Sequence, residues 1–175
     1  MASRELDDVT NRKKYKEEKF NGKRSMKDEY TGERIFYGNA KDAKYKHSST
    51  ADSDHVTSIE VVKKRYGDLK PEQQKKIVNN EKYNYAMTDA SLNRSKGGLE
   101  NHEYLARKLK RAKTAYQSGE KDKAKQEIKE FTKQAPKMLS KEVKSRTAMA
   151  IEGNVYRVQN VSEKLTVWKR RTTTT

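Results

Sequence analysis

The chain of 175 residues contains no cysteine, only two prolines and a single tryptophan. The absence of cysteine excludes disulfide bonds and zinc sites built from cysteine, and it is compatible with a reducing cytoplasm. Apolar residues make up 31% of the chain, and no apolar run is long enough to span a bilayer. We therefore expect a modest core, no membrane partner and a cytoplasmic location.

Acidic residues are outnumbered: 25 Asp and Glu stand against 41 Lys and Arg, for a formal net charge of +16. Such an excess attracts polyanions, and nucleic acid is the commonest partner of this kind. A charge that serves only solubility, or a ribosome-like packing role, is the alternative interpretation.

Strand and helix signals both occur between residues 28 and 105, and we expect an α+β fold. Aromatic and β-branched residues predict strands within 30–38, 43–47, 50–56 and 83–87. Capping signals predict helices at 58–67 and 71–78, with Ser58 or Thr57 as the first cap and Pro71 as the first residue of the second helix. Thr88 is the expected cap of a helix that continues to Asn93.

The two ends of the chain are basic and of simpler composition. Residues 1–27 predict a short helix and a basic arm, either solvated or bound to nucleic acid. Residues 101–117 and 124–135 carry apolar residues at helical spacing, and Pro136 predicts a break before a helix at 138–151. A turn at Gly153-Asn154, a hairpin from 155–161 and 165–168, and four disordered terminal threonines are expected next.

The central stretch carries residue types that suit phosphodiester cleavage. Asp54 and His55 lie at the end of a predicted strand, and Asn93 lies in the first turns of the next helix. A histidine can take a proton from water near pH 7, whereas carboxylate and amide oxygens suit hard cations such as Mg²⁺. Arg94 and Lys96 could hold a phosphate or lie on a solvated face. Taken singly, each of these residues has an ordinary structural explanation.

Three short motifs together resemble the HNH endonucleases, the ββα-metal or His-Me finger superfamily. They are Asp54-His55-Val56, the run Asn84-Tyr-Ala-Met-Thr, and Leu92-Asn93-Arg94-Ser95-Lys96-Gly97. The nine-residue spacing from Asn84 to Asn93 is similar to that of the HNH domain of CRISPR effectors. The resemblance covers residues 28–105, and the zinc knuckle found in many HNH proteins is absent because the chain has no cysteine.

The resemblance implies a role for each matched residue. His55 would be the general base that activates water, and Asp54 and Asn93 would hold one Mg²⁺ or Mn²⁺ ion. Asn84 would support the loop that carries the histidine, and Asp52 is a second-rank candidate on the same strand face as Asp54. His47 and His102 are expected to be bystanders.

These observations predict three parts: a basic arm (1–27), an HNH nuclease domain with a small ββα-metal core and a helical insertion (28–105), and a basic helical extension (106–175).

The expected function is cleavage of DNA, with RNA as the alternative substrate, in a phage, mobile-element, defence or toxin setting within a bacterial cell. A non-catalytic nucleic-acid-binding or protein-interaction module that keeps the HNH shape is the competing hypothesis. An inhibitor or partner protein is a further candidate partner, and the oligomeric state is left open. The expected nucleic-acid contacts are Arg94, Lys96, Arg107, Lys108, Lys110 and Arg111.

Overall fold

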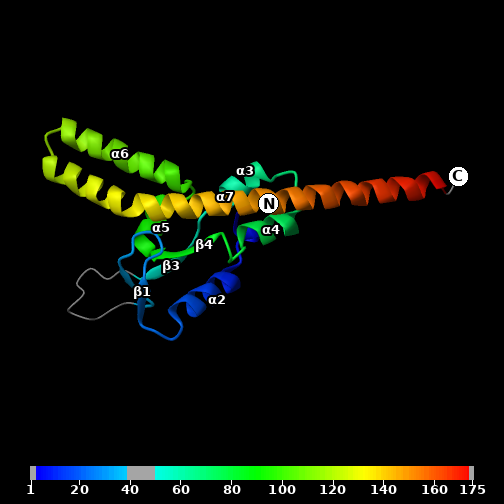
Figure 1. Cartoon of the computed structure of the whole chain (residues 1–175), viewed down its shortest axis with the longest axis horizontal. Coiled ribbons are helices and arrows are strands. Elements are labelled where there is room, and N and C mark those ends of the chain that lie inside the picture. The colour runs from blue at the N-terminus through cyan, green and yellow to red at the C-terminus, as the bar shows by residue number, and fades with distance from the viewer. Residues whose placement is uncertain (1–2, 39–49, 174–175) are drawn as a thin grey trace.

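A computed structural model describes residues 3–38 and 50–173 of the chain. The helices are α1 (Ser3–Leu6), α2 (Val9–Phe20), α3 (Ile59–Arg65), α4 (Pro71–Val78), α5 (Ala90–Lys96), α6 (Asn101–Gln117) and α7 (Lys121–Thr173). The strands are β1 (Ser25–Lys27), β2 (Arg34–Phe36), β3 (Ala51–His55) and β4 (Tyr85–Asp89). Two small antiparallel sheets beside a long C-terminal helix confirm the predicted α+β class (Figure 1). Within the described part of the chain, no helix has the length and apolar character needed to cross a membrane.

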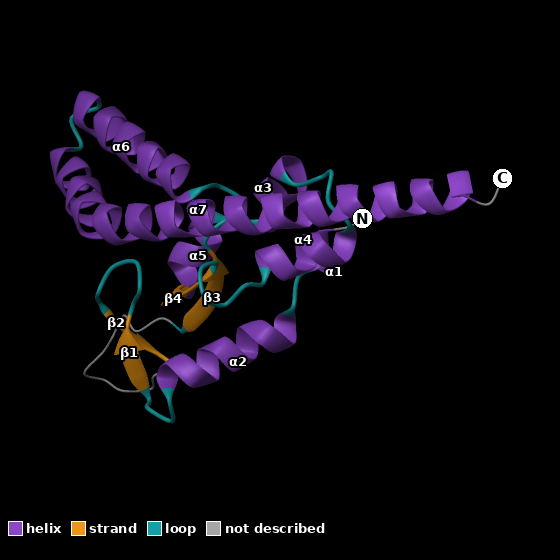
Figure 2. Ribbon diagram, turned by 45° about the vertical axis from the view of Figure 1, so that its right-hand side comes forward, coloured by secondary structure: helices purple, strands orange, loops and turns teal. Residues whose placement is uncertain are grey.

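The central unit is a pair of strands followed directly by a helix. Strands β3 and β4 pair antiparallel, and α5 begins at the residue after β4. Helices α3 and α4 form the insertion between the two strands, as predicted. Figure 2 shows this strand layer between α2 on one side and α7 on the other. The two sides of the strand layer are therefore covered by helices that lie far apart in the sequence.

Local signals place most element starts in this unit. Ser58 caps α3 by accepting a hydrogen bond from the backbone of Val61, and Pro71 begins α4. The predicted cap of α5 was wrong: Asp89 caps this helix, whereas Thr88 is buried in β4 and donates a hydrogen bond to Asp28. The strand predicted at 43–47 lies outside the described residues.

The N-terminal segment is part of the fold, which corrects the prediction of a basic arm. Leu6 is buried against α3 and α4, in a core that includes Val62 and Ile77. Tyr15 and Phe20 of α2 are buried with residues of β2, β3 and β4. Lys13, Lys14 and Lys19 are exposed on α2, whereas Lys16 donates to the backbone carbonyl of Ala51 in β3. The segment therefore combines a basic surface with a packed inner side.

Helices α6 and α7 form an antiparallel hairpin that closes the other face of the central unit. Tyr104 and Leu105 of α6 and Met138 of α7 are buried with Ala86 of β4. The connection turns at Gly119, whose φ of 81° is a backbone conformation that suits glycine. The prediction of a mostly helical C-terminal extension is therefore confirmed.

Helix α7 is continuous, which overturns the interruptions predicted within it. Pro136 costs a helix interior about 3 kcal/mol, but the buried neighbours Ala135 and Met138 hold the helix on both sides of it. Figure 1 shows α7 curving near its start, as a proline-containing helix does. Gly153 is not a turn: a Cβ there would lie 2.6 Å from Tyr66, so glycine permits close packing of α7 on that ring.

The predicted hairpin at 155–161 and 165–168 is also wrong, because both segments belong to α7. Once a helix is established, each further residue adds one backbone hydrogen bond, whereas an isolated two-stranded hairpin is marginal in water. The helix continues through Thr173, so the prediction of disorder is wrong for Thr172 and Thr173; the last two threonines lie outside the described residues.

Candidate active site

The register of β3 and β4 separates the polar residues of β3 onto two faces. Asp54 lies opposite Ala86 and His55 lies opposite Tyr85. Asp52 and Asp54 face α5, where they contact Asn93 and Lys96 respectively. His55 faces the other side, where its ring packs at 5.3 Å from that of Tyr85.

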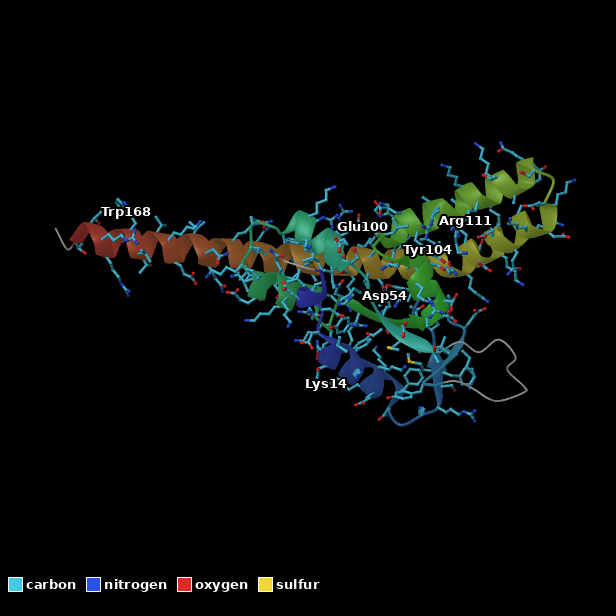
Figure 3. All side chains as sticks on the ribbon, turned by 180° about the vertical axis from the view of Figure 1, so that it is seen from behind. Lys14, Asp54, Glu100, Tyr104, Arg111 and Trp168 are labelled. Atoms are coloured by element: carbon cyan, nitrogen blue, oxygen red, sulfur yellow. The ribbon has the colours of Figure 1, made fainter. Side chains whose placement is uncertain are left out.

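A cavity of about 270 Å³ nevertheless brings three predicted residues together. Asp54 and His55 from β3 and Asn93 from α5 all line it, and Gly97 and Gly98 form part of its wall. Strand β3 ends at His55, so its last two side chains, Asp54 and His55, lie at the end of the sheet where α5 also ends. Figure 3 shows Asp54 within the strand layer, between α2 and α7.

The hydrogen bonds of Asn79 determine which nitrogen of His55 carries a proton. The amide nitrogen of Asn79 donates to the carbonyls of Leu6 (2.6 Å) and Lys75 (2.8 Å). Its oxygen accepts from the hydroxyl of Tyr85 at 2.8 Å and lies 3.1 Å from His55 Nε2. Because an amide oxygen can only accept, Nε2 carries the hydrogen and Nδ1 is the nitrogen that can take a proton.

The ring of His55 is held in its neutral form near pH 7. Burial lowers the pKa of His55 below its ordinary value, while the bond to Asn79 and the carboxylates of Asp54 and Asp7 oppose this shift. Desolvation is the larger influence, because a buried imidazolium loses its hydration. The geometry therefore offers a neutral imidazole with one fixed hydrogen bond at the edge of the cavity.

Asp54 is a buried carboxylate with two partners on one oxygen. Its Oδ2 accepts from the hydroxyl of Tyr30 at 2.5 Å and from Lys96 Nζ at 2.8 Å. Lys96 also donates to the backbone carbonyl of His55 at 2.9 Å. Burial and the nearby carboxylate raise the pKa of Tyr30 far above its ordinary value, so its hydroxyl remains a donor. These contacts fix Asp54 and leave its Oδ1 as the oxygen available to a ligand.

Asn93 lies close to a second carboxylate. Its side-chain nitrogen is 3.5 Å from Asp52 Oδ2, a long contact that orients the amide nitrogen toward Asp52. The amide oxygen is then the group of Asn93 that can bind a cation in the cavity. Asp52 does not line this cavity but lies beside Asn93.

Asn84 is fully buried and joins three segments of the chain. Its amide nitrogen donates to the carbonyls of Thr57 (3.0 Å) and Val78 (2.7 Å). Its oxygen accepts from the backbone of Thr57 and from the hydroxyl of Ser145, each at 2.7 Å. Thr57 follows His55 by two residues, so these bonds hold the loop that leaves the histidine, and this geometry is what the resemblance implies for Asn84.

Sequence reasoning missed several residues that complete the site. Asp7, which lies between α1 and α2, and Arg12 of α2 also line the cavity, and Arg12 is paired with Asp7 through two bonds of 2.8 and 2.6 Å. Ser145 of α7 binds both Asn84 and the hydroxyl of Thr57. No local motif surrounds these residues, so no sequence signal could have found them.

The predicted nucleic-acid contacts divide by exposure. Lys96 and Lys108 are buried, so the prediction is wrong for both: Lys96 pairs with Asp54, and Lys108 pairs with Glu127 and Glu130. Arg107 is half-buried and donates to the carbonyl of Ser95. Arg94, Lys110 and Arg111 are exposed, so they remain predicted nucleic-acid contacts.

A separate group of possible ligands lies at the start of α6. Among the described residues, the acidic and histidine side chains whose ligand atoms lie within 4.8 Å of one another are Glu100, His102 and Glu103. Protein contacts already occupy all three: Glu100 accepts from Arg65, His102 bonds Glu142, and Glu103 accepts from the backbone of Glu100. His47, the other predicted bystander, lies outside the described residues.

Comparison of the chain with protein-family models, with curated proteins and with solved structures finds no match. The geometry of the cavity and the sequence motifs are therefore the basis for assigning a function.

Proposed function

We propose that the chain is a metal-dependent endonuclease of the HNH type that hydrolyses phosphodiester bonds in DNA. One observation carries the proposal: Asp54, His55 and Asn93, which the sequence motifs singled out, line the same cavity. Asn84, the remaining motif residue, bonds the loop that follows His55. A coincidental motif would have no reason to produce this convergence.

In this proposal His55 takes the proton from the attacking water through Nδ1. The bond from Nε2 to Asn79 keeps the ring in one orientation and stabilises the positive charge that the ring acquires. The lowered pKa of His55 keeps the ring neutral before the reaction. Asn84 acts as a positioning residue, because it holds the backbone of Thr57 rather than the reacting groups.

The donor set of the cavity fits a hard divalent cation. Asp54 Oδ1 and the amide oxygen of Asn93 would hold the ion, and oxygen donors of this kind favour Mg²⁺ or Mn²⁺ over Zn²⁺. When bound, such an ion supplies positive charge to the phosphoryl and leaving oxygens. Tyr30 and Lys96 would keep Asp54 in place.

The charge of the chain supports a nucleic-acid substrate. The net charge of +16 favours a polyanion, and the exposed Arg94 lies on α5 one residue after Asn93. Lys110 and Arg111 on α6 extend the exposed basic surface. RNA is the alternative substrate.

The ion pair of Asp54 favours a second candidate function. Lys96 already places a positive charge against this carboxylate, which weakens its attraction for a metal ion. A chain in which that ammonium replaces the ion would bind nucleic acid without cutting it. The two functions predict different results with the same substrate.

The deciding experiment incubates the protein with supercoiled plasmid and Mg²⁺ or Mn²⁺. The enzyme hypothesis expects nicking that EDTA and His55→Ala abolish, while His102→Ala, which removes a histidine outside the cavity, retains it. Equal nicking by His55→Ala would exclude the proposed base. Absence of cleavage of both DNA and RNA, with binding that weakens steeply as salt rises, would instead support the non-catalytic candidate.

A further inference from the structure

The C-terminal part of α7 carries a line of exposed apolar side chains. Their exposed fractions lie between 49% and 66%, and they are Ile151, Val155, Val158, Val161, Leu165 and Trp168. Ile151, Val158 and Leu165 repeat every seven residues, and Val161 and Trp168 follow the last two of them by three. This is the a/d spacing with which one helix packs against another. We call this line the α7 seam.

The domain holds this part of α7 by the opposite face, which packs Tyr156 against the core and is otherwise polar. Asn160 and Gln73 of α4 exchange two hydrogen bonds of 2.9 Å, and Glu163 pairs with Lys70 at 2.7 Å. In a seven-residue repeat these α7 residues lie away from the a and d positions. A surface helix normally turns its apolar face toward its own core. Here the orientation is reversed, so the described part of the chain leaves the α7 seam facing outward.

The seam also extends beyond the rest of the fold. Figures 1 and 2 both show α7 continuing past α4 as a single helix that ends at the C-terminus. Residues 154–173 would span about 30 Å at the usual helical rise. Contiguous apolar surface of this kind commonly marks a site of association with another molecule.

The charges beside the seam disfavour a second copy of this chain. Lys164 and Lys169 occupy the flanking g and e positions of the repeat, where residues of a partner helix would meet them. In a parallel pair, Lys164 of one copy would lie beside Lys169 of the other. An antiparallel pair also brings basic flanks together. Glu163 is the acidic residue of 154–173, and Lys70 already pairs with it.

The width of the seam disfavours a lipid surface. Helices that lie on membranes carry a broad apolar face opposite a strongly polar one. The α7 seam is narrow, because Asn154 occupies one of its d positions and Ser162 and Lys169 lie beside it. A narrow apolar line with basic edges is complementary to a helix that has an apolar line and acidic edges.

We infer that the α7 seam is the docking surface for an amphipathic helix of another protein, with aliphatic residues at a and d and Asp or Glu on both flanks. This inference does not depend on the proposed cleavage activity. It requires only that residues 151–173 remain helical and that the apolar residues of the seam remain exposed, as they are in the structure.

Trp168 provides the test, because it is the single tryptophan of the chain and belongs to the seam. The probe is a synthetic peptide of about three heptads with Leu at a and d and Glu at e and g. The same peptide with Lys at e and g is its control. Titration of the full chain with the acidic peptide should shift the Trp168 emission to shorter wavelength and saturate, and the shift should weaken as salt rises.

Two neighbouring substitutions separate the seam from the general charge of the helix. Val158→Glu places a carboxylate in the seam, and Gln159→Glu adds the same charge on the exposed face beside it. Val158→Glu should weaken peptide binding at least about tenfold, because it removes a buried apolar contact and desolvates a charge. Gln159→Glu should change the affinity by no more than about twofold. Circular dichroism should show equal helix content in both variants.

Several results would overturn the inference. The inference would be wrong if the acidic peptide caused no shift of the Trp168 emission, or if the lysine peptide bound equally well. It would also be wrong if both substitutions weakened peptide binding to the same extent. A shift caused by anionic phosphatidylglycerol vesicles but not by the acidic peptide would assign the seam to a lipid surface. Sedimentation that detects a dimer broken by Val158→Glu would assign it to a second copy.

Discussion

The buried pair between Lys96 and Asp54 gives a quantitative test of the site's architecture. The two side chains are 0% and 5% exposed, and their charged atoms lie 2.8 Å apart. Lys96→Met retains most of the side-chain volume but removes the ammonium, so Asp54 keeps only the hydroxyl of Tyr30 on that oxygen. Breaking a buried pair in this way costs about 3–5 kcal/mol. Because the Tyr30 bond remains, we expect a loss of about 3 kcal/mol in the free energy of unfolding.

Urea denaturation of a double-mutant cycle measures this interaction. Asp54→Asn leaves Lys96 with the carbonyl of His55 as its partner and should also destabilise the fold. The double variant leaves no unpaired charge, so its stability should recover and reveal a coupling of about 2 kcal/mol. Lys110→Met is the matched control, because Lys110 is exposed and its loss should change stability by less than about 0.5 kcal/mol.

Two results would refute this reasoning. If Lys96→Met lowered the free energy of unfolding no more than Lys110→Met, the ammonium of Lys96 would not be buried against Asp54. Lys96 would then again be a candidate phosphate contact. If the losses of the two single variants simply added in the double variant, the pair would not interact as its geometry requires.

Four further predictions concern the cavity and its supports. Because burial lowers the pKa of His55, the acid limb of the kcat/KM profile should have its midpoint below about pH 6.5. The control variant His102→Gln should leave this midpoint unchanged. A midpoint above about pH 6.5 would contradict the role of His55 as the base. The same shift means that the unfolded chain binds this proton more tightly, so stability to urea should fall as the pH drops below about 6.5, and the fall should shrink in His55→Gln. Asn93→Ala should abolish metal-dependent cleavage yet change the free energy of unfolding by less than about 1 kcal/mol, since its 3.5 Å contact is weak; a large loss of stability would mark Asn93 as structural. Asn84→Ala removes four buried hydrogen bonds worth about 1 kcal/mol each and should cost about 4 kcal/mol by urea denaturation, and a loss below about 1 kcal/mol would exclude its supporting role.

Features with a local physical cause were predictable from the sequence. Pro71 lacks a backbone N–H and has a restricted φ, so it begins α4 as predicted, and Ser58 caps α3 through its own hydroxyl. The presence of both strand and helix signals, together with the resemblance to HNH proteins, predicted the α+β class. The motif residues Asp54, His55 and Asn93 were predicted to converge, and they line one cavity.

Features that depend on distant neighbours were predicted wrongly. Pro136 and Gly153 are breakers by their local preference, but α7 continues through both because distant residues pack against it. Lys96 has the composition of a solvated phosphate contact, yet the fold buries it against Asp54. Propensity accounts for tenths of a kcal/mol to a few kcal/mol per residue, so tertiary packing can override it.

The sequence by itself determined the fold class, the starts of α3 and α4, and three of the residues that line the candidate site, Asp54, His55 and Asn93. Only the tertiary structure decided their environment: which nitrogen of His55 is available, which oxygen of Asp54 is occupied, and which face of α7 points outward. The physical reason is that these properties depend on partners supplied from elsewhere in the chain, such as Asn79 for His55 and Asn160 with Gln73 for α7. Local chemistry identifies the residues that could form a site, and long-range contacts determine their charge, orientation and exposure.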